Sequence, residues 1–498
     1  MTARTVMVQG TGSSVGKSLM ATALCRILRL DGYEVAPFKA QNMSLNSFVT
    51  PDGAEIGRST AVQAQAAGVL PTADMNPVLL KPEVDYRSQL IVHGRVAGKL
   101  ESKAFDRPRP GLWEAVVESL DRLRSEYEVV VIEGAGSPAE INLRGGDIVN
   151  MEVALHARAP VLLVGDIDKG GVFASLYGTM LLISPEEREL VAGTVINKFR
   201  GDVSLLDSGL VKLEELTGVP VLGVVPYFRD IHVPEEDSPS VKSVEGVEGA
   251  LLDIVVIALP HISNFDDFDP LEREAGVGLR YVRTLDELGT PDLVVLPGTK
   301  TTMADLDALR EGGLADAVVS LARGGTAVVG ICGGFQMLGR RILDPGRVES
   351  GRGEAEGLGL LPVVTTFDER KETRQVLGRV EADYGMLEGC RGLDFTGYEI
   401  HMGRSEGGRE PFVLDGDSRR GDGALSDDGW VLGTYVHGLF LNDGLRRGML
   451  RRIAERKGVS LPEGEGAFDQ GAEYDKLAAH FRGSLDMEAV YRAMGLRG

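Results

Sequence analysis

Cys332 lies in the sequence Ala327–Arg340, an apolar run that breaks at a glycine-flanked cysteine and continues with the periodicity of a helix. A strand that enters a helix through Gly-x-Cys-x-Gly holds the middle residue in a tight turn and leaves its side chain exposed at the end of the strand. The positive end of the helix then favours the thiolate. We interpret Cys332 as a candidate nucleophile, with a buried core cysteine as the alternative.

A cysteine nucleophile needs a base, and His437 is the best candidate because it follows an expected strand near the end of the chain. An oxyanion hole needs backbone donors, which the N–H of Gly333 and the turn around Gly298 would supply. Gln336 comes one helical turn after Cys332 and is expected to contact the substrate. This pattern predicts nucleophilic catalysis by a cysteine.

A second reactive pattern is the glycine-rich loop Gly10–Ser18, which joins a β run to the helical segment Leu19–Arg29. In such a loop the backbone N–H groups hold phosphates, the lysine neutralises them and the serine ligates Mg²⁺. The expected ATP contacts are Gly12, Ser13, Val15, Gly16, Lys17 and Ser18. Thr11 stands where the first glycine is usual, and the longer loop resembles that of the dethiobiotin synthetase group. A glycine-rich turn without a ligand is the alternative.

Two later strands of this half end in residues suited to the same site. Glu133 ends a continuous apolar run, where a P-loop enzyme keeps the carboxylate that orders Mg²⁺. Asn197 ends another run and resembles the nucleobase-recognising asparagine of related P-loop folds. Repeated strand-then-helix units with polar strand ends predict a doubly wound sheet.

Polar residues also follow the expected second strand. Lys39, Gln41 and Asn42 would lie on the ligand-binding edge of the sheet, and we assign them to the substrate. Asp52, in the next loop, is a candidate metal or substrate contact, although an exposed turn aspartate is an equal alternative.

The length of 498 residues exceeds what one hydrophobic core usually supports. The segment near residues 232–250 is acidic and lacks apolar periodicity, and a new α/β pattern follows it. We therefore predict an α/β protein with two doubly wound domains: a P-loop domain over 1–235, a linker over 236–250, and a second domain over 251–498 that carries Cys332 and His437 and ends in a C-terminal helix.

A formal net charge of −21 disfavours nucleic acid and anionic membranes as partners. The N-terminal sequence has no basic-then-apolar leader and no apolar run approaches a membrane span, so a cytoplasmic location is expected. The three cysteines lack metal-ligand spacing and suit a reducing compartment. Because the chain is negatively charged overall, sites for anionic substrates would need Lys, Arg and backbone N–H groups clustered locally. The sequence does not predict an oligomeric state.

The segment Gly330–Gln336 resembles the nucleophile motif of class I glutamine amidotransferases, and Tyr435–Phe440 resembles the histidine segment of the branch that amidates corrinoids. Members of the wider family usually have a glutamate two residues after the histidine. Leu439 occupies that position here, so the third member of the triad is missing and the group that orients His437 is undetermined.

The whole chain resembles the cobyric acid synthase family. The supporting segments are 37–46, 76–82, 133–142, 168–174, 262–270 and 398–404. The resemblance implies a carbon–nitrogen ligase of cobalamin biosynthesis that amidates the b, d, e and g carboxylates of (adenosyl)cobyrinic acid a,c-diamide. It implies corrinoid, glutamine and ATP as small-molecule partners, Mg²⁺ with the nucleotide, and no tightly bound organic cofactor. Activation as an acyl phosphate and a protected path for ammonia would follow from this chemistry.

Two alternatives remain at this point. Cobyrinic acid a,c-diamide synthase is a sister enzyme with the same two modules and fewer amidations. A regulatory P-loop ATPase of the partitioning type, with a degenerate amidotransferase-like domain used for binding, is favoured slightly by Leu439 and disfavoured by Cys332, Gln336 and His437.

Overall fold

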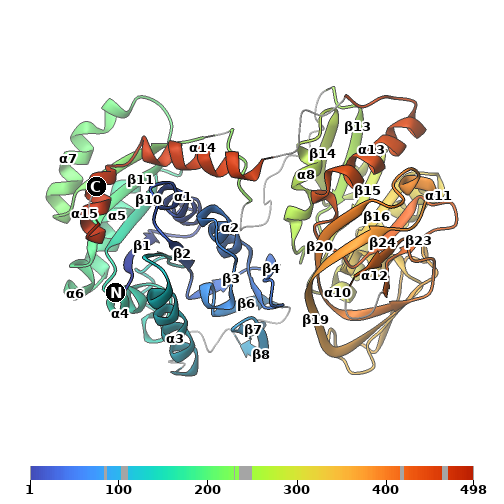
Figure 1. Ribbon diagram of the computed structural model, residues 1–498, viewed down its shortest axis with the longest axis horizontal. Coiled ribbons are helices and arrows are strands. Elements are labelled where there is room, and N and C mark those ends of the chain that lie inside the picture. Colours follow the sequence, from blue (N-terminus) through green and yellow to red (C-terminus); the bar gives the residue numbers. More distant parts are fainter. Residues whose placement is uncertain are drawn as a thin grey trace. The chain divides into compact units, whose positions relative to one another are not determined.

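The computed structural model describes residues 2–83, 87–101, 110–228, 230–234, 249–415, 420–462 and 469–496. The chain forms two compact units, drawn in Figure 1 with colours that follow the sequence. The first unit comprises Met1–Ser44, Ala54–Asp237 and Phe468–Gly498, and the second comprises Leu45–Gly53 and Ser238–Ala467.

The first unit is built around a six-stranded parallel sheet in the order β12-β11-β10-β1-β9-β2. Its strands are β1 (Arg4–Gly10), β2 (Val35–Phe38), β9 (Val129–Glu133), β10 (Val161–Asp166), β11 (Val191–Phe199) and β12 (Val221–Pro226). They are apolar along most of their length, as strands covered on both faces must be. The sheet order changes direction at β1, which places the end of β1 where open α/β sheets bind ligands.

Helices cover both faces of this sheet, so the unit is doubly wound. They are α1 (Lys17–Leu30), α2 (Arg58–Ala67), α3 (Pro110–Glu126), α4 (Met151–Ala157), α5 (Val172–Leu182), α6 (Pro185–Arg188) and α7 (Asp207–Thr217). Alternate residues of β1 face opposite cores: Val6 and Val8 pack with α1, and Met7 packs with α3, α4 and α5.

The C-terminal helices belong to the first unit, which corrects the expected boundary of the second domain. Instead of one helix there are two, α14 (Gln470–Arg482) and α15 (Met487–Met494). Phe481 is buried in the same core as Leu24 of α1, and Arg26 of α1 pairs with Asp475 at 2.7 Å. Figure 1 shows α14, in red, beside α1. The physical reason is that α1 exposes an apolar face to this side, which α14 covers.

A small mixed sheet of the first unit, β3-β6-β7-β8, was not expected from the sequence. Its strands are β3 (Gln41–Met43), β6 (Val78–Pro82), β7 (Arg87–Val92) and β8 (Arg95–Glu101), and β5 (Glu55–Gly57) leads into α2. This sheet fixes the segment after Lys39, because β3 pairs with β6 from Gln41 to Met43.

The second unit has a central sheet in the order β14-β13-β15-β16-β24-β23, parallel except for β23. Its strands are β13 (Leu252–Ile257), β14 (Val277–Val282), β15 (Leu293–Leu296), β16 (Ala327–Ile331), β23 (Ala424–Leu425) and β24 (Val431–Thr434). Its helices are α8 (Asp269–Glu272), α9 (Leu285–Leu288), α10 (Thr302–Glu311), α11 (Leu314–Arg323), α12 (Gly333–Leu338) and α13 (Asp443–Lys457).

A second sheet in this unit was also not expected. It contains β17 (Arg341–Leu343), β18 (Glu354–Glu356), β19 (Val364–Val380), β20 (Asp394–Glu406), β21 (Phe412–Leu414) and β22 (Arg420–Asp422). The long strands β19 and β20 pair antiparallel, with a register shift between Phe367 and Glu372. This hairpin carries β20 past the end of β16, where Cys332 lies.

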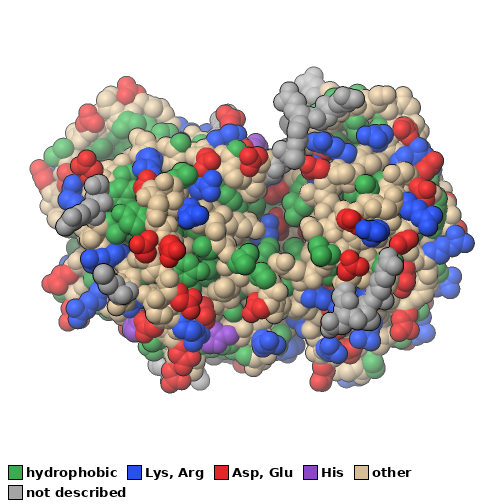
Figure 2. Space-filling model, viewed as in Figure 1, with side chains coloured by type: hydrophobic (Ala, Val, Ile, Leu, Met, Phe, Trp, Pro, Cys, Tyr) green, Lys and Arg blue, Asp and Glu red, His purple; other side chains and the backbone are tan. Residues whose placement is uncertain are grey.

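The predicted α/β class with two parallel-dominated sheets is confirmed. The expected linker falls largely on residues 235–248, which lie outside the described part of the chain. Figure 2 shows acidic and basic side chains interspersed on the visible face of each unit. None of the helices in the described ranges has both the length and the apolar character needed to cross a lipid bilayer.

Candidate active site

The glycine-rich loop of the first unit lies between β1 and α1, as predicted. Gly16 caps α1 with φ of 103°, a conformation that favours glycine. A Cβ on Gly10 would lie 2.5 Å from the Val15 side chain, so the close turn requires glycine at the end of β1. Gly12 and Ser13 form the outer part of the loop, with Ser13 exposed.

Lys17 lies under this loop. Its Nζ donates to the Gly12 carbonyl at 2.8 Å and to the Gly136 carbonyl at 3.0 Å. The ammonium group is therefore held by two backbone oxygens at the carboxyl edge of the sheet, next to loop N–H groups. A phosphate bound there would meet a fixed positive charge.

Glu133 is the central polar residue of this site, because its carboxylate joins three elements. Oε1 accepts from Ser18 Oγ at 2.8 Å and from Lys39 Nζ at 2.9 Å, and Oε2 accepts from Gln63 Nε2 at 2.5 Å. Glu133 and Lys39 are both almost fully buried. The structure thus brings together predicted residues from the P-loop, from β9 and from the position directly after β2, and it adds Gln63 of α2, which the sequence analysis missed.

The donor set fits Mg²⁺. Ser18 Oγ and Glu133 Oε1 are neighbouring oxygens, and Mg²⁺ in nucleotide sites typically takes one or two protein oxygens, the rest coming from phosphates and water. Among the described residues there is no group of three or more His, Cys, Asp or Glu side chains that could hold a metal ion.

Asn197 lies beneath the P-loop at the end of β11. Its Nδ2 donates to the Val15 carbonyl at 2.9 Å. The same Nδ2 packs against Gly16, because a Cβ added to Gly16 would lie 2.1 Å from it. In this position Asn197 supports the loop. Its contact with a nucleobase stays a prediction.

Several buried polar atoms around α2 have no hydrogen-bond partner among the described residues. They are Asn42 Nδ2, Ser59 Oγ, Thr60 Oγ1 and Gln63 Oε1. Asn42 points at the start of α2, since a Cβ on Gly57 would lie 2.1 Å from its Nδ2. Gly57, the N-cap of α2, provides no side-chain cap, so N–H groups of the first turn face the same region.

Asn76 fixes the backbone around this group of atoms. Its Oδ1 accepts from the Gly57 N–H at 2.9 Å, and its Nδ2 donates to the carbonyls of Lys39 and Val78 at 2.9 and 3.0 Å. One buried amide therefore connects α2, β2 and β6. Lys39, Asn42 and the start of α2 are held together as a consequence.

The remaining two candidates of this half lie elsewhere. Gln41, on β3, is partly exposed. Asp52 is exposed, accepts a hydrogen bond from Thr50, and belongs by its contacts to the second unit, whereas Ser18 and Glu133 belong to the first. The structure therefore does not group Asp52 with the other metal candidates within one unit.

In the second unit, Cys332 lies in the predicted turn between β16 and α12. Its φ of 51° and ψ of −106° are unusual for a residue with a side chain, and such a conformation costs about 1–3 kcal/mol. The turn is possible because its neighbours are small: a Cβ on Gly334 would lie 2.0 Å from the Leu296 carbonyl.

The thiol is less open than the turn alone predicts. Cys332 exposes 8% of its surface, and its Sγ lies 3.5 Å from the Ile400 carbonyl of β20. A strand at this position was not expected from the local pattern around Cys332. The strand covers the sulfur and leaves a small part of the residue accessible.

His437 is oriented by Asp267, which replaces the missing glutamate. His437 Nδ1 lies 2.7 Å from Asp267 Oδ2, and the Gly438 N–H donates to Asp267 Oδ1 at 2.7 Å. Leu439, at the position of the usual glutamate, is fully buried. Asp267 comes from the 3₁₀ helix Phe265–Phe268, far from His437 in sequence. Three side chains, Cys332, His437 and Asp267, thus form a triad.

The electrostatics of the triad favour a charged imidazole. Burial lowers the pKa of His437, but the Asp267 carboxylate and the hydrogen-bonded Cys332 side chain outweigh burial and raise it to about 10. Protonated His437 beside Cys332 would stabilise the thiolate. The ring is also held on its face by Tyr398, with centroids 5.2 Å apart and planes 12° from parallel.

Both glycines expected to form an oxyanion hole lie beside the triad. A Cβ on Gly298 would lie 3.0 Å from His437 Cε1, and one on Gly333 would lie 2.6 Å from the Thr299 side chain. Their N–H groups as oxyanion donors stay a prediction. Gln336 is almost fully buried, and its amide bonds to Thr302 Oγ1 at 2.8 Å and Tyr435 Oη at 3.4 Å.

Asp267 is the candidate functional residue that the sequence analysis missed most clearly. The signal available was the acidic pair Asp266-Asp267 between two phenylalanines, because carboxylates in an apolar segment need a buried partner. The pair alone does not identify the partner, since His437 lies 170 positions away in sequence.

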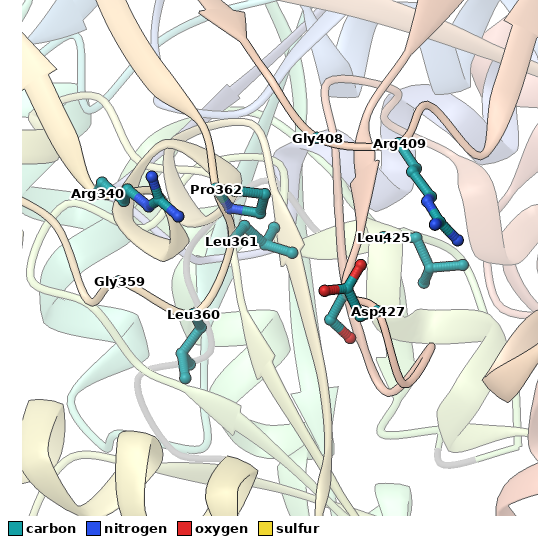
Figure 3. Close-up of a pocket in the computed structure, with 10 residues that line it drawn as sticks. Arg340, Gly359, Leu360, Leu361, Pro362, Gly408, Arg409, Leu425 and Asp427 are labelled. Atoms are coloured by element: carbon teal, nitrogen blue, oxygen red, sulfur yellow. The ribbon is translucent and has the colours of Figure 1, made fainter.

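A hollow of about 250 Å³ in the second unit lies outside both groups of candidates. Figure 3 shows Arg340, Leu360 and Pro362 on one side of it and Arg409 and Leu425 on the other. No predicted catalytic or substrate residue lines it. The chemistry of the triad and the P-loop, and not this hollow, defines the candidate site.

Comparisons with known proteins cover both units. Residues 6–240 match the CobQ/CobB/MinD/ParA nucleotide binding domain, and residues 253–445 match the CobB/CobQ-like glutamine amidotransferase domain. The chain is 50% identical over 496 residues to a cobyric acid synthase of Dehalococcoides mccartyi strain CBDB1, covering 98% of each chain. It is 54% identical over 519 residues to the cobyric acid synthase of Sorangium cellulosum, covering 100% of this chain and 99% of the relative.

Proposed function

The chain belongs to the cobyric acid synthase family, and from this premise we propose that it amidates the b, d, e and g carboxylates of (adenosyl)cobyrinic acid a,c-diamide. It is a glutamine-dependent ligase that uses ATP, and its product in this proposal is (adenosyl)cobyric acid. The observation that carries the proposal is the Cys332–His437–Asp267 triad in a chain that also has a P-loop.

Cys332 is the nucleophile of the glutaminase half-reaction. Its thiolate attacks the side-chain amide of glutamine, forms a glutamyl thioester and releases ammonia. His437 gives its proton to the leaving nitrogen and then accepts one from the water that hydrolyses the thioester. Asp267 keeps the imidazole in the orientation that this proton transfer needs.

The P-loop half-reaction activates the acceptor. A carboxylate does not react with ammonia, because oxide would have to leave, whereas an acyl phosphate has a good leaving group. Transfer of the γ-phosphoryl group of ATP to a corrinoid carboxylate forms this acyl phosphate. Lys17 and the loop N–H groups bind the phosphates. Mg²⁺, which Ser18 and Glu133 would hold, supplies charge neutralisation on the transferred phosphoryl group.

The buried atoms near α2 support a place for the corrinoid carboxylate. Lys39 gives a cation beside Glu133, and Asn42, Ser59 and Thr60 give polar atoms that find no partner among the described residues. An unpaired buried polar atom costs about 1–3 kcal/mol, so a carboxylate that accepts from these donors would relieve that cost. We assign Lys39 and Asn42 to the acceptor carboxylate, and Gln41 to the rim of this site.

The proposal is tested with purified protein, ATP, Mg²⁺, glutamine labelled with ¹⁵N in the side-chain amide, and the corrinoid a,c-diamide. Mass spectrometry should find a product with labelled nitrogen at the b, d, e and g positions. Amidation of the a and c carboxylates of cobyrinic acid, with none of the diamide, would contradict the assigned substrate. ATP hydrolysis without any release of ammonia from glutamine would contradict the ligase reaction itself.

A further inference from the structure

Residues Leu45–Gly53, here called the inserted segment, belong to the second unit although the chain on both sides belongs to the first. The segment contains the short strand β4 (Ser47–Val49). It begins directly after β3, which carries Gln41 and Asn42. These nine residues thus interrupt the sequence of the P-loop unit and pack in the unit that carries the triad.

The inserted segment is attached to the second unit through a pair of asparagines. Asn46 Oδ1 accepts from the Asn264 N–H at 2.7 Å, and Asn264 Oδ1 accepts from the Ser47 N–H at 3.1 Å. The Asn46 side chain thus bonds to the backbone of Asn264, and the Asn264 side chain bonds to the backbone of Ser47, the residue after Asn46. Both asparagines are 2% exposed. Buried reciprocal bonds of this kind fix one register, because breaking one leaves a polar group unpaired.

Asn264 connects the inserted segment to Asp267 and Tyr398, the two residues that hold His437. Its φ of 53° places it in the left-handed region, where it turns the chain into the 3₁₀ helix that carries Asp267. Its Nδ2 donates to Tyr398 Oη at 3.2 Å, and the Tyr398 ring stacks on His437. A shift of Asn264 would therefore move the carboxylate and the aromatic face that orient the imidazole.

Apolar contacts of the inserted segment reach the same residues. Val49 forms a buried cluster with Tyr398 and Ile400, and the Ile400 carbonyl is the group 3.5 Å from Cys332 Sγ. The Phe48 ring lies 6.2 Å from the Tyr398 ring. The segment therefore packs on β20 where this strand covers the thiol.

We propose that the inserted segment is a positioning element for the triad, acting through Asn46 and Asn264, and that it makes glutamine hydrolysis respond to a corrinoid bound at β3. The second part rests on the proposed function, because it takes Asn42 as a corrinoid contact. Three residues separate Asn42 from Asn46, so a ligand that fixes Asn42 also restricts the segment that holds Asn264. Ammonia is then released when an acceptor is in place.

The test uses the full-length protein with Asn46→Ala and the conservative variant Asn46→Asp, which keeps an acceptor oxygen. We expect Asn46→Ala to lower kcat for glutamine hydrolysis about tenfold to hundredfold, the size of effect known for a misplaced catalytic group. The KM for glutamine should stay within about threefold, since no glutamine contact is removed. Asn46→Asp should retain more activity than Asn46→Ala.

Two further measurements separate positioning from general damage. Amidation with ammonia as the nitrogen source should be unchanged in Asn46→Ala, because that reaction does not use the triad. The alkaline limb of the glutaminase pH profile should move to lower pH if Asn46 acts through Asp267 and His437. An unchanged kcat in Asn46→Ala, or equal loss with glutamine and with ammonia, would overturn the positioning role. If Asn46→Ala does not fold, Asn264→Gly, which keeps the left-handed turn, is measured in its place.

The corrinoid response is measured in the same variants. In the wild type, the corrinoid diamide with ATP should raise glutaminase kcat, and in Asn46→Ala this stimulation should be lost. Absence of stimulation in a wild type that amidates the diamide would overturn the response. If the wild type does not amidate the diamide with either nitrogen source, the proposed function fails, while kcat without corrinoid still decides the positioning role.

Discussion

The two centres of this protein differ in what holds their reactive groups. In the second unit His437 is fixed by Asp267 and Tyr398, and Cys332 by a strained turn, all of them contacts within the protein. In the first unit Glu133 is bonded on both oxygens, but buried polar atoms of Asn42, Ser59 and Thr60, on α2 and next to its start, lack partners in the described ranges.

This difference matches the substrates that the proposed function assigns to the two centres. Glutamine is always the same small molecule, so a preorganised triad needs no adjustment to its substrate. In the proposed reaction the P-loop centre accepts several carboxylates of one large corrinoid in turn. Hydrogen-bond partners supplied by each incoming carboxylate would suit that task. The triad should therefore fail sharply when one contact is removed, whereas the group of Asn42, Ser59 and Thr60, whose partners would come with the substrate, should fail gradually.

Among the residues that support the nucleophile and the phosphates, the largest expected effect is that of Asp267→Asn. Loss of the carboxylate removes the group that orients and charges His437, and glutamine-dependent kcat should fall by about 10²–10⁴-fold. Amidation with ammonia should be retained. The control is Glu272→Gln, which removes an exposed carboxylate from the adjoining helix α8 without touching His437. Similar losses in the two variants would show that Asp267 acts only through general charge.

Lys17→Ala should lower amidation with glutamine and with ammonia equally, by about 10²–10³-fold, because a fixed charge on the transferred phosphoryl group is lost. Glutaminase activity measured without ATP should be unaffected, since Lys17 belongs to the other unit. Lys212→Ala, at an exposed lysine of α7, serves as the matched control. Retained ammonia-dependent amidation in Lys17→Ala would contradict the assigned role of the P-loop.

The pH dependence should also separate the centres. Because Asp267 and Cys332 raise the pKa of His437 to about 10, the protonated imidazole persists through neutral pH and is lost as pH rises through that value. The alkaline limb of glutaminase activity should lie near pH 10 and move down by about one unit or more in Asp267→Asn. The stability contributed by this charge is complete below the ordinary imidazole pKa and is lost over the same alkaline range. A limb at the same pH in both proteins would be inconsistent with this pairing.

The smallest expected effect is that of Thr60→Val, a change of nearly constant volume. If the hydroxyl donates to the corrinoid carboxylate, the KM for corrinoid should rise about twofold to tenfold, the worth of one hydrogen bond. The melting temperature should not fall, because the hydroxyl has no partner within the described chain. Thr22→Val removes a buried hydroxyl that bonds to the Ser18 carbonyl, and it should lower stability instead. An unchanged corrinoid KM in Thr60→Val would remove Thr60 from the substrate site.

How far the sequence predicts this protein depends on the range of each interaction. The P-loop, the Cys332 turn and most parallel strands are local patterns, and the structure has them where they were expected. The second sheet was missed because β19 and β20 are long and partly exposed, without the buried apolar runs of the central strands. Asp267 was missed because orientation of His437 depends on a contact between residues far apart in sequence. The C-terminal helices were placed in the wrong unit for the same reason: their partner is α1.

The division of labour between the two centres is tested most directly by Cys332→Ser. Amidation of the corrinoid diamide is measured with glutamine and, separately, with ammonia, both with ATP. Our account predicts that the variant loses the glutamine-dependent reaction and keeps the ammonia-dependent one. Equal loss of both reactions would contradict it.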